Sequence, residues 1–211
     1  MKALAILAAA IAIGALVIVG FAYSGLYDVS ARSPYSGPLD WLLSTTSRAS
    51  VVRRAKDVDV PNLDNDDLVL AGANDFDAMC VGCHGKPGKP PTALARGLNP
   101  PAPDLAESAR FMTPAELFWV TKHGIKMTGM PAWGASHQDD ELWPVVALML
   151  ALPTLDTDAY RVLLRRAAGI GHHSAPDQQP STHSHHEPPA TPVVDEQSAA
   201  AEEHDHADHA H

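Results

Sequence analysis

Two cysteines and a histidine stand together in the stretch Cys80-Val81-Gly82-Cys83-His84, which uses both cysteines of the 211-residue chain. The spacing C-x-x-C-H is typical of covalent attachment of a c-type haem. Two thioether bonds to the haem vinyl groups need two thiols one short turn apart. The histidine beside the second thiol is then held under the iron, where its imidazole is the proximal ligand. The pattern therefore predicts that Cys80 and Cys83 bind one haem covalently and that His84 ligates its iron.

Two other roles of a C-x-x-C pair fit the chain less well. A redox-active dithiol is usually found near a βαβ pattern, and the sequence has no such pattern. A structural zinc site needs four ligands, and the chain has no second cysteine pair. A covalently held haem, in a chain with no other catalytic motif, points to electron transfer.

The second axial position of the iron has several candidate ligands after the haem motif: Met112, Met127, Met130, Met149, His123 and His137. Met130 is favoured because it lies in the turn-rich stretch Gly129-Met130-Pro131-Ala132-Trp133, and such a loop can present a thioether opposite His84. Met127 remains the competing ligand. Met112 and Met149 are expected in packing, and His123 is expected at a helix end, where it caps carbonyl groups.

Three helices are expected to position these residues. The first covers about residues 66–80, where Leu68, Gly72, Phe76 and Cys80 recur every four residues and share one face. Gly72 on that face permits another helix to approach closely.

The second helix begins after Thr113, with Pro114 at its first position and Glu116 completing a capping box, and it stops at Gly124. The third covers about residues 139–152. Pro144 lies inside it, so this helix either begins late or is kinked there.

The chain divides into five predicted segments. An apolar segment (1–23) precedes a connector (24–66), in which residues 41–43 and 51–52 form either short amphipathic helices or part of a loosely ordered linker. A haem domain (67–155), a C-terminal extension (156–170) and a disordered tail (171–211) follow. About 90 residues make a small core, so we expect the domain and its haem to depend on one another.

The N-terminal segment is uncharged from Ala3 to Tyr23, which is long enough to span a bilayer as a helix. A cleaved signal sequence is the alternative, but its apolar core is usually shorter, about 7–15 residues. Positive charges after the segment would place the domain inside the cell. The haem motif overrides that count, because this kind of haem attachment occurs on the oxidising side of a membrane. We therefore expect a bacterial inner-membrane anchor with the haem domain in the periplasm.

The tail carries most of the net charge of −10 and most of the histidines. Residues 171–211 hold eight acidic residues and no Lys or Arg, which leaves 17 acidic and 15 basic residues in residues 1–170. The tail contains nine of the twelve histidines, His172 and His173 among them. Seven are candidate ligands for copper, zinc or nickel, the alternative being a solvated extension whose metal affinity is incidental: His183, His185, His186, His204, His206, His209 and His211.

The order of these motifs resembles that of the class I c-type cytochromes. In that family a Gly-x-x-x-aromatic helix precedes C-x-x-C-H-G, a proline-rich loop, a G-M-P-A-aromatic loop and a final helix. The corresponding stretches here are residues 72–76, 80–85, 99–105, 129–133 and 141–143. The resemblance covers about residues 67–155. It implies a small all-α cytochrome c fold around one covalent haem c, with His84 and Met130 as axial ligands.

The predicted function is one-electron transfer between membrane or periplasmic redox enzymes, by a carrier or a subunit of an oxidoreductase complex rather than an enzyme in its own right. Redox proteins are the expected partners, and the absence of a basic stripe argues against nucleic acid. Five basic residues (Lys86, Lys89, Arg96, Lys122 and Lys126) either form a cluster around the haem edge, where they would attract an acidic partner, or are scattered solvated side chains. Two alternatives remain: redox-linked metal handling by the tail, and a haem enzyme or gas sensor in which Met130 is displaceable.

Overall fold

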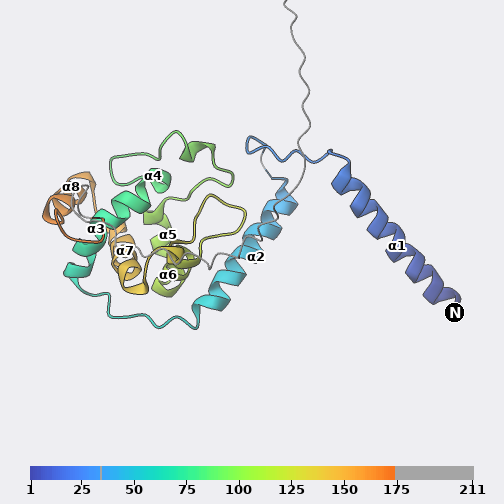
Figure 1. The fold of residues 1–211 in the computed structure, drawn as a ribbon, viewed down its shortest axis with the longest axis horizontal. Helices are drawn as coiled ribbons and strands as arrows, with labels where there is room; N and C mark the ends of the chain where they lie inside the picture. The colour runs from blue at the N-terminus through green and yellow to red at the C-terminus, as the bar shows by residue number, and fades with distance from the viewer. Residues whose placement is uncertain (34, 174–211) are drawn as a thin grey trace, which may run out of the picture. The chain divides into compact units, whose positions relative to one another are not determined.

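The computed structural model describes residues 1–33 and 35–173, which are helical and contain no β-strand. These residues form eight α-helices: α1 (Lys2–Tyr23), α2 (Gly37–Ala55), α3 (Asp66–Met79), α4 (Val81–His84), α5 (Leu105–Phe111), α6 (Pro114–His123), α7 (Asp139–Ala151) and α8 (Thr157–Arg166). Three 3₁₀ helices lie between them: η1 (Ala95–Gly97), η2 (Trp133–Ala135) and η3 (Leu152–Thr154). The predicted all-α class is confirmed (Figure 1).

The packing centres on the contact between α3 and α7. A Cβ atom at Gly72 of α3 would lie 2.1 Å from the carbonyl oxygen of Pro144 in α7, so the two backbones touch at this point. The close approach expected at Gly72 is therefore present. Pro144 lies inside α7, which begins at Asp139, so the predicted alternative of a late helix start is wrong. Since proline has no N–H group, this turn of α7 lacks one backbone hydrogen bond.

The buried core gathers around these two helices, with α8 beside α3 (Figure 1). Tyr160 of α8 is 1% exposed, and its ring meets that of Phe76 edge-on at 6.5 Å between centroids. Burial raises the pKa of the Tyr160 hydroxyl, and the nearby Asp77 raises it further. The largest fully buried side chains are Tyr160, Phe76, Leu142, Leu148, Val145 and Val146.

Side-chain caps explain where several helices begin. Thr113 and Glu116 form the predicted capping box at the start of α6, and α6 ends before Gly124, whose φ is +63°. Asn65 accepts a hydrogen bond from the N–H of Asp67 at the start of α3. An N-cap of this kind typically contributes about 1 kcal/mol of helix stability. The predicted limits of these two helices agree with the structure to within one residue.

The connector contains a single helix of 19 residues, α2, rather than two short amphipathic helices or a loose linker. Pro38 occupies the start of α2, where its missing N–H is not needed. The far end packs against α6, with Val51 and Ala55 buried.

Two further helices were not expected, α5 and α8. Each begins at an aspartate whose carboxylate accepts a backbone N–H: Asp104 for α5 and Asp156 for α8. Because α2 and α8 both pack on the haem domain, the packed unit extends beyond the predicted limits of 67 and 155.

The start of the predicted tail also packs against the domain. Gly171 has a φ of +96° and lies so close to α3 that a Cβ atom there would be 2.5 Å from the carbonyl oxygen of Ala71. The N–H groups of His172 and His173 donate to the carboxylate of Asp75, at 3.3 and 2.7 Å. Residues 171–173 are thus held on α3, which differs from the disordered start predicted for this segment.

The crossing of α3 and α7 makes a direct prediction for Gly72→Ala. The added methyl group meets backbone atoms that cannot rotate away, so we expect the free energy of unfolding to fall by about 1–3 kcal/mol, the usual cost of overpacking. Denaturant unfolding of the haem-loaded protein measures this. Gly97→Ala is the matched control, because nothing lies within 4 Å of a Cβ atom there. An unchanged denaturant midpoint of unfolding in Gly72→Ala would contradict the close backbone contact between α3 and α7.

Candidate haem site

The three residues of the C-x-x-C-H motif lie where α3 passes into α4. Cys80 ends α3, and its carbonyl oxygen accepts hydrogen bonds from the N–H groups of Cys83 at 3.1 Å and His84 at 2.9 Å. One tight turn therefore brings the two sulfur atoms and the imidazole to the same side of the chain. All three residues line one cavity of about 510 Å³.

The cavity walls are largely apolar and come from most of the packed helices. Its volume lies in the range of about 300–1,000 Å³ that small-molecule and cofactor sites occupy. The lining residues beyond the haem motif come from α2, the proline-rich loop, α5, α6, the methionine loop and α7; they include Arg48, Val51, Val52, Pro100, Pro103, Leu105, Leu117, Val120, Ile125, Met130, Trp133 and Met149. An apolar cavity that carries two thiols and an imidazole on its wall fits a haem group.

His84 is oriented by a backbone carbonyl group. Its Nδ1 atom lies 2.7 Å from the carbonyl oxygen of Pro103. A carbonyl oxygen only accepts hydrogen bonds, so Nδ1 carries the proton and donates it, and Nε2 keeps its lone pair for a metal ion. Pro103 lies 19 residues after His84, in the proline-rich loop.

Met130 lies on a loop that hydrogen bonds hold in place. Thr128 is central to this loop: its hydroxyl group donates to the carbonyl of Ile125 at 2.8 Å and accepts the N–H of Met130 at 3.1 Å. The N–H of Ile125 donates in turn to the carbonyl of Met130 at 3.3 Å. A Cβ atom at Gly124 would lie 2.7 Å from that same carbonyl oxygen, so the loop packs against a glycine with positive φ. Met130 is half-buried and lines the cavity.

The structure places the competing axial candidates differently. Met127 is 83% exposed, has a φ of +59° and does not line the cavity. His123 is exposed at the end of α6 beside the ring of Trp119. His137 is buried but lies outside the cavity lining.

More methionines line the cavity than the sequence predicted. Met112 and Met149 pack as expected, Met149 being 3% exposed, and both also line the cavity. Met79 lines it too, although it precedes the motif and was not considered. The contribution of α2, through Arg48, was also missed, because residues 24–66 read as a connector and only long-range packing brings α2 to the cavity.

The environment of Cys80 makes its thiol a weak nucleophile. Burial raises its pKa to about 12, and the neighbouring Cys83 and Asp75 raise it as well. At neutral pH the thiol is therefore protonated, and a protonated thiol is a weak nucleophile. This environment is unlike that of a redox-active dithiol.

Two residues of the predicted basic cluster are neutralised by partners. Lys86 forms an ion pair with Asp77 and lies against the ring of Tyr160, with its side chain only 16% exposed. Lys122 pairs with Asp139 at 2.6 Å. Lys86 and Lys122 therefore each have an acidic partner within the domain, which reduces the positive charge that the predicted cluster could offer to a redox protein.

The seven tail histidines proposed as metal ligands lie outside the described residues: His183, His185, His186, His204, His206, His209 and His211. The tail as a metal-binding segment therefore stays a prediction from composition.

The loop geometry makes a prediction for Thr128→Val. Removing the hydroxyl group leaves the Met130 N–H without its acceptor, a loss of about 1 kcal/mol. We expect the Met130 amide hydrogen to exchange several times faster, measured by NMR on haem-loaded protein. Thr154→Val is the control, because its hydroxyl also donates to the carbonyl three residues earlier but lies in η3. Equal Met130 exchange rates in the two variants would contradict the role of Thr128.

Comparison with known proteins agrees with this geometry. Residues 67–149 match the family model described as cytochrome c oxidase, cbb3-type, subunit III. No curated protein and no solved structure matches the chain. The matched residues contain α4, the cavity-lining loops and all but the terminal residues of α3 and α7. Residues 67–149 therefore form a c-type cytochrome domain, which carries a covalently bound haem c.

Proposed function

We propose that this protein transfers single electrons between redox proteins through a haem ligated by His84 and Met130. The observation that supports this most directly is the pair of side chains on one cavity. His84 is fixed with its Nε2 lone pair available, and Met130 lies on a hydrogen-bonded loop that reaches the same cavity. One-electron oxidation and reduction are the chemistry that haem iron supplies when it is bound.

In this proposal Cys80 and Cys83 hold the haem by thioether bonds. They are the two cysteines of the chain, they lie one turn apart, and both line the cavity. Arg48 of α2 is a cation on the cavity wall and suits a haem carboxylate group.

The ligand pair and the walls have chemical consequences. A thioether is a soft ligand that favours ferrous iron, so Met130 would raise the reduction potential of a bound haem relative to two histidines. With His84 and Met130 both bound to the iron, no coordination position would remain for oxygen or peroxide. The apolar walls, Leu117 and Val120 among them, exclude water from the ligands. These properties favour a carrier over an enzyme.

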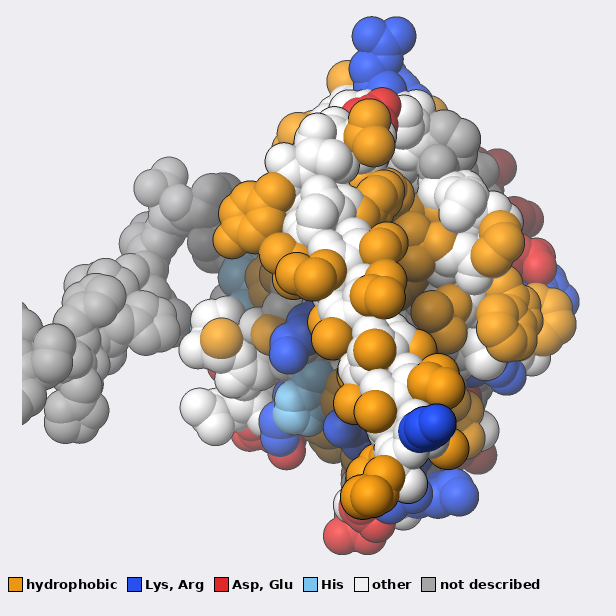
Figure 2. Space-filling model, turned by 90° about the vertical axis from the view of Figure 1, so that its right-hand side faces the viewer, with side chains coloured by type: hydrophobic (Ala, Val, Ile, Leu, Met, Phe, Trp, Pro, Cys, Tyr) orange, Lys and Arg blue, Asp and Glu red, His pale blue; other side chains and the backbone are white. Residues whose placement is uncertain are grey.

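We infer that α1 anchors the domain to a membrane. Its 22 residues correspond to a length of about 33 Å, enough to cross the hydrocarbon core of a bilayer. Its mean hydropathy is 2.8 and none of its residues is buried. Figure 2 shows apolar side chains along the part of α1 that faces the viewer. Because c-type haem is attached on the oxidising side of a membrane, we place the domain in the periplasm of a bacterium.

The family match favours one kind of partner. Its description names subunit III of a cbb3-type cytochrome c oxidase. We therefore propose that this chain passes electrons to such a membrane oxidase, as a carrier or as a bound subunit.

Met130→Ala tests the axial ligand. We expect loss of the near-infrared sulfur-to-iron band of the ferric protein and a fall in reduction potential, within the span of about 0.8 V over which axial ligands set haem potentials. Met127→Ala is the matched control, since Met127 is three residues away and exposed. The proposal fails if Met127→Ala, and not Met130→Ala, abolishes the band.

Carbon monoxide distinguishes the carrier from a haem enzyme or gas sensor. With both axial positions filled, the reduced full-length protein should show no change in its visible spectrum under carbon monoxide at neutral pH. Met130→Ala should bind the gas and serves as the positive control. Rapid binding by the unaltered protein would show that Met130 is displaced easily, and would favour the sensor or enzyme instead.

A further inference from the structure

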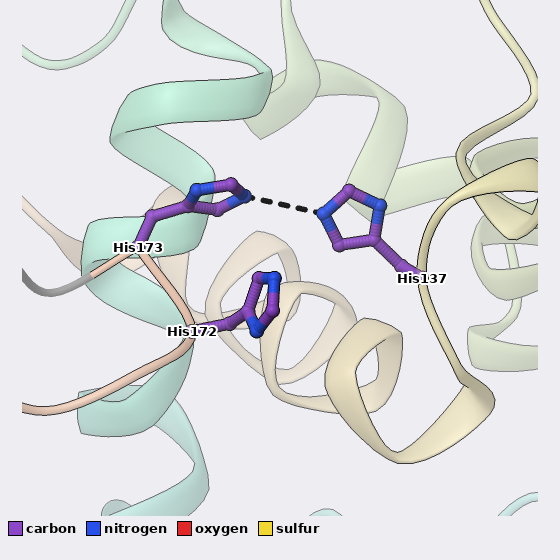
Figure 3. Close-up of side chains that lie close together, drawn as sticks. All are labelled: His137, His172 and His173. Atoms are coloured by element: carbon purple, nitrogen blue, oxygen red, sulfur yellow. Dashed lines mark hydrogen bonds between the residues drawn. The ribbon is translucent and has the colours of Figure 1, made fainter. Parts of the chain in front are cut away.

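Three histidines outside the haem cavity meet in one place. His137 lies between η2 and α7, and His172 and His173 follow α8 at the end of the described chain. One ring nitrogen from each of the three lies within 4.8 Å of the others, and the Nε2 atoms of His137 and His173 are 3.2 Å apart. Figure 3 shows the three rings turned toward a common space, His137 from one side and the other two from the opposite side.

His137 is the buried member of the group, at 9% exposure. Its Nδ1 atom lies 2.8 Å from the hydroxyl oxygen of Ser136 and 3.3 Å from the carbonyl oxygen of Trp133. The contact with the carbonyl is a hydrogen bond only when Nδ1 carries the proton, because a carbonyl oxygen cannot donate. That tautomer directs the Nε2 lone pair toward His173.

His172 is oriented by a carboxylate. Its Nδ1 atom lies 2.9 Å from Oε1 of Glu141, while Oε2 of Glu141 accepts the backbone N–H of Gln138 at the start of α7. A carboxylate that binds one ring nitrogen of a histidine fixes the tautomer and makes the other nitrogen a better metal ligand. Glu141 also brings negative charge close to the three rings.

The backbone that carries His172 and His173 is held by α3. Asp75, which is 3% exposed, accepts both of their N–H groups. The neighbouring Asn74 donates from its amide nitrogen to the carbonyls of Ala167 at 2.6 Å and Ile170 at 2.7 Å. Two adjacent residues of α3 thus fix the segment before a metal ion arrives, which lowers the entropy lost on binding.

The geometry points to a binding site for one divalent late transition-metal ion, with Zn²⁺ as the best fit, formed by His137, His172 and His173. Imidazole is a preferred ligand of zinc, copper and nickel. Metal–nitrogen bonds of about 2.0–2.1 Å in a tetrahedral site put ligand nitrogens about 3.3 Å apart, close to the 3.2 Å between His137 and His173. A small shift of the exposed His172 ring that keeps its contact with Glu141 would bring in the third nitrogen, which already lies within 4.8 Å of the other two, and would leave the fourth position for water.

Zinc binding to the full-length, haem-loaded protein tests this site. The seven histidines after residue 173 would also bind zinc, so all seven are replaced by glutamine in the background protein. Isothermal titration should then show one equivalent of Zn²⁺ bound with a Kd at or below about 10 μM. Zinc X-ray absorption should report three imidazole nitrogens.

Substitutions locate the site. His173→Gln changes an exposed residue that does not contribute to the core, and His137→Gln changes the buried ligand. Each should weaken zinc binding at least about tenfold. His123→Gln, an exposed histidine outside the group, should leave the Kd unchanged. The reduction potential of each variant shows whether the haem site is intact, since Trp133 contacts His137 and also lines the haem cavity.

Two results would overturn the proposal. One is a Kd in the millimolar range for the background protein. The other is zinc binding that is equally tight after His173→Gln, with the protein still folded by circular dichroism. In either case the three rings pack against one another at the end of the domain and do not form a metal site.

Discussion

The backbone contact between Gly72 and Pro144 is the constraint on which the rest of the domain depends. It allows α3 and α7 to touch without an intervening side chain, which brings the buried residues of both helices together. Helix α3 is followed directly by Cys80 on the wall of the haem cavity, and Met149 of α7 lies on that wall too. Because a side chain at residue 72 would separate the helices, the cavity would lose its shape at the place where the haem is attached.

Local signals in the sequence predicted the parts of the site that lie on one short stretch of chain. The attachment motif, the Thr113 capping box and the Met130 loop can each be recognised from a few consecutive residues. The structure places Cys80 and Met130 on one cavity. The helices α5 and α8 have equally local signals in their aspartate caps, Asp104 and Asp156. The Pro103 acceptor could not be predicted, since any carbonyl group in the proline-rich loops satisfies the same chemistry.

The role of α2 and the grouping of the three histidines depend on contacts between residues far apart in the sequence. Residues 24–66 have the turns of a connector, and only the contact with α6 shows that α2 forms part of the haem cavity. The same is true of the three histidines. His172 and His173 belong by composition to a solvated tail, and a single buried carboxylate on α3, Asp75, fixes them on the domain beside His137. Composition averages over a segment and therefore misses a contact that three residues make.

The two proposed metal sites differ in how the metal is retained, and this difference has physical consequences. Haem attached through Cys80 and Cys83, as proposed, would not leave by dissociation, so occupancy of the first site would be independent of the surrounding metal concentration. An ion held by three imidazoles exchanges with solution, and its occupancy follows free metal and pH, because a ligating histidine must be neutral. Binding to His137, His172 and His173 would stabilise the folded domain by mass action. The exchangeable ion would then link the packing of residues 171–173 on α3 to the metal supply, while the electron-transfer centre keeps its iron.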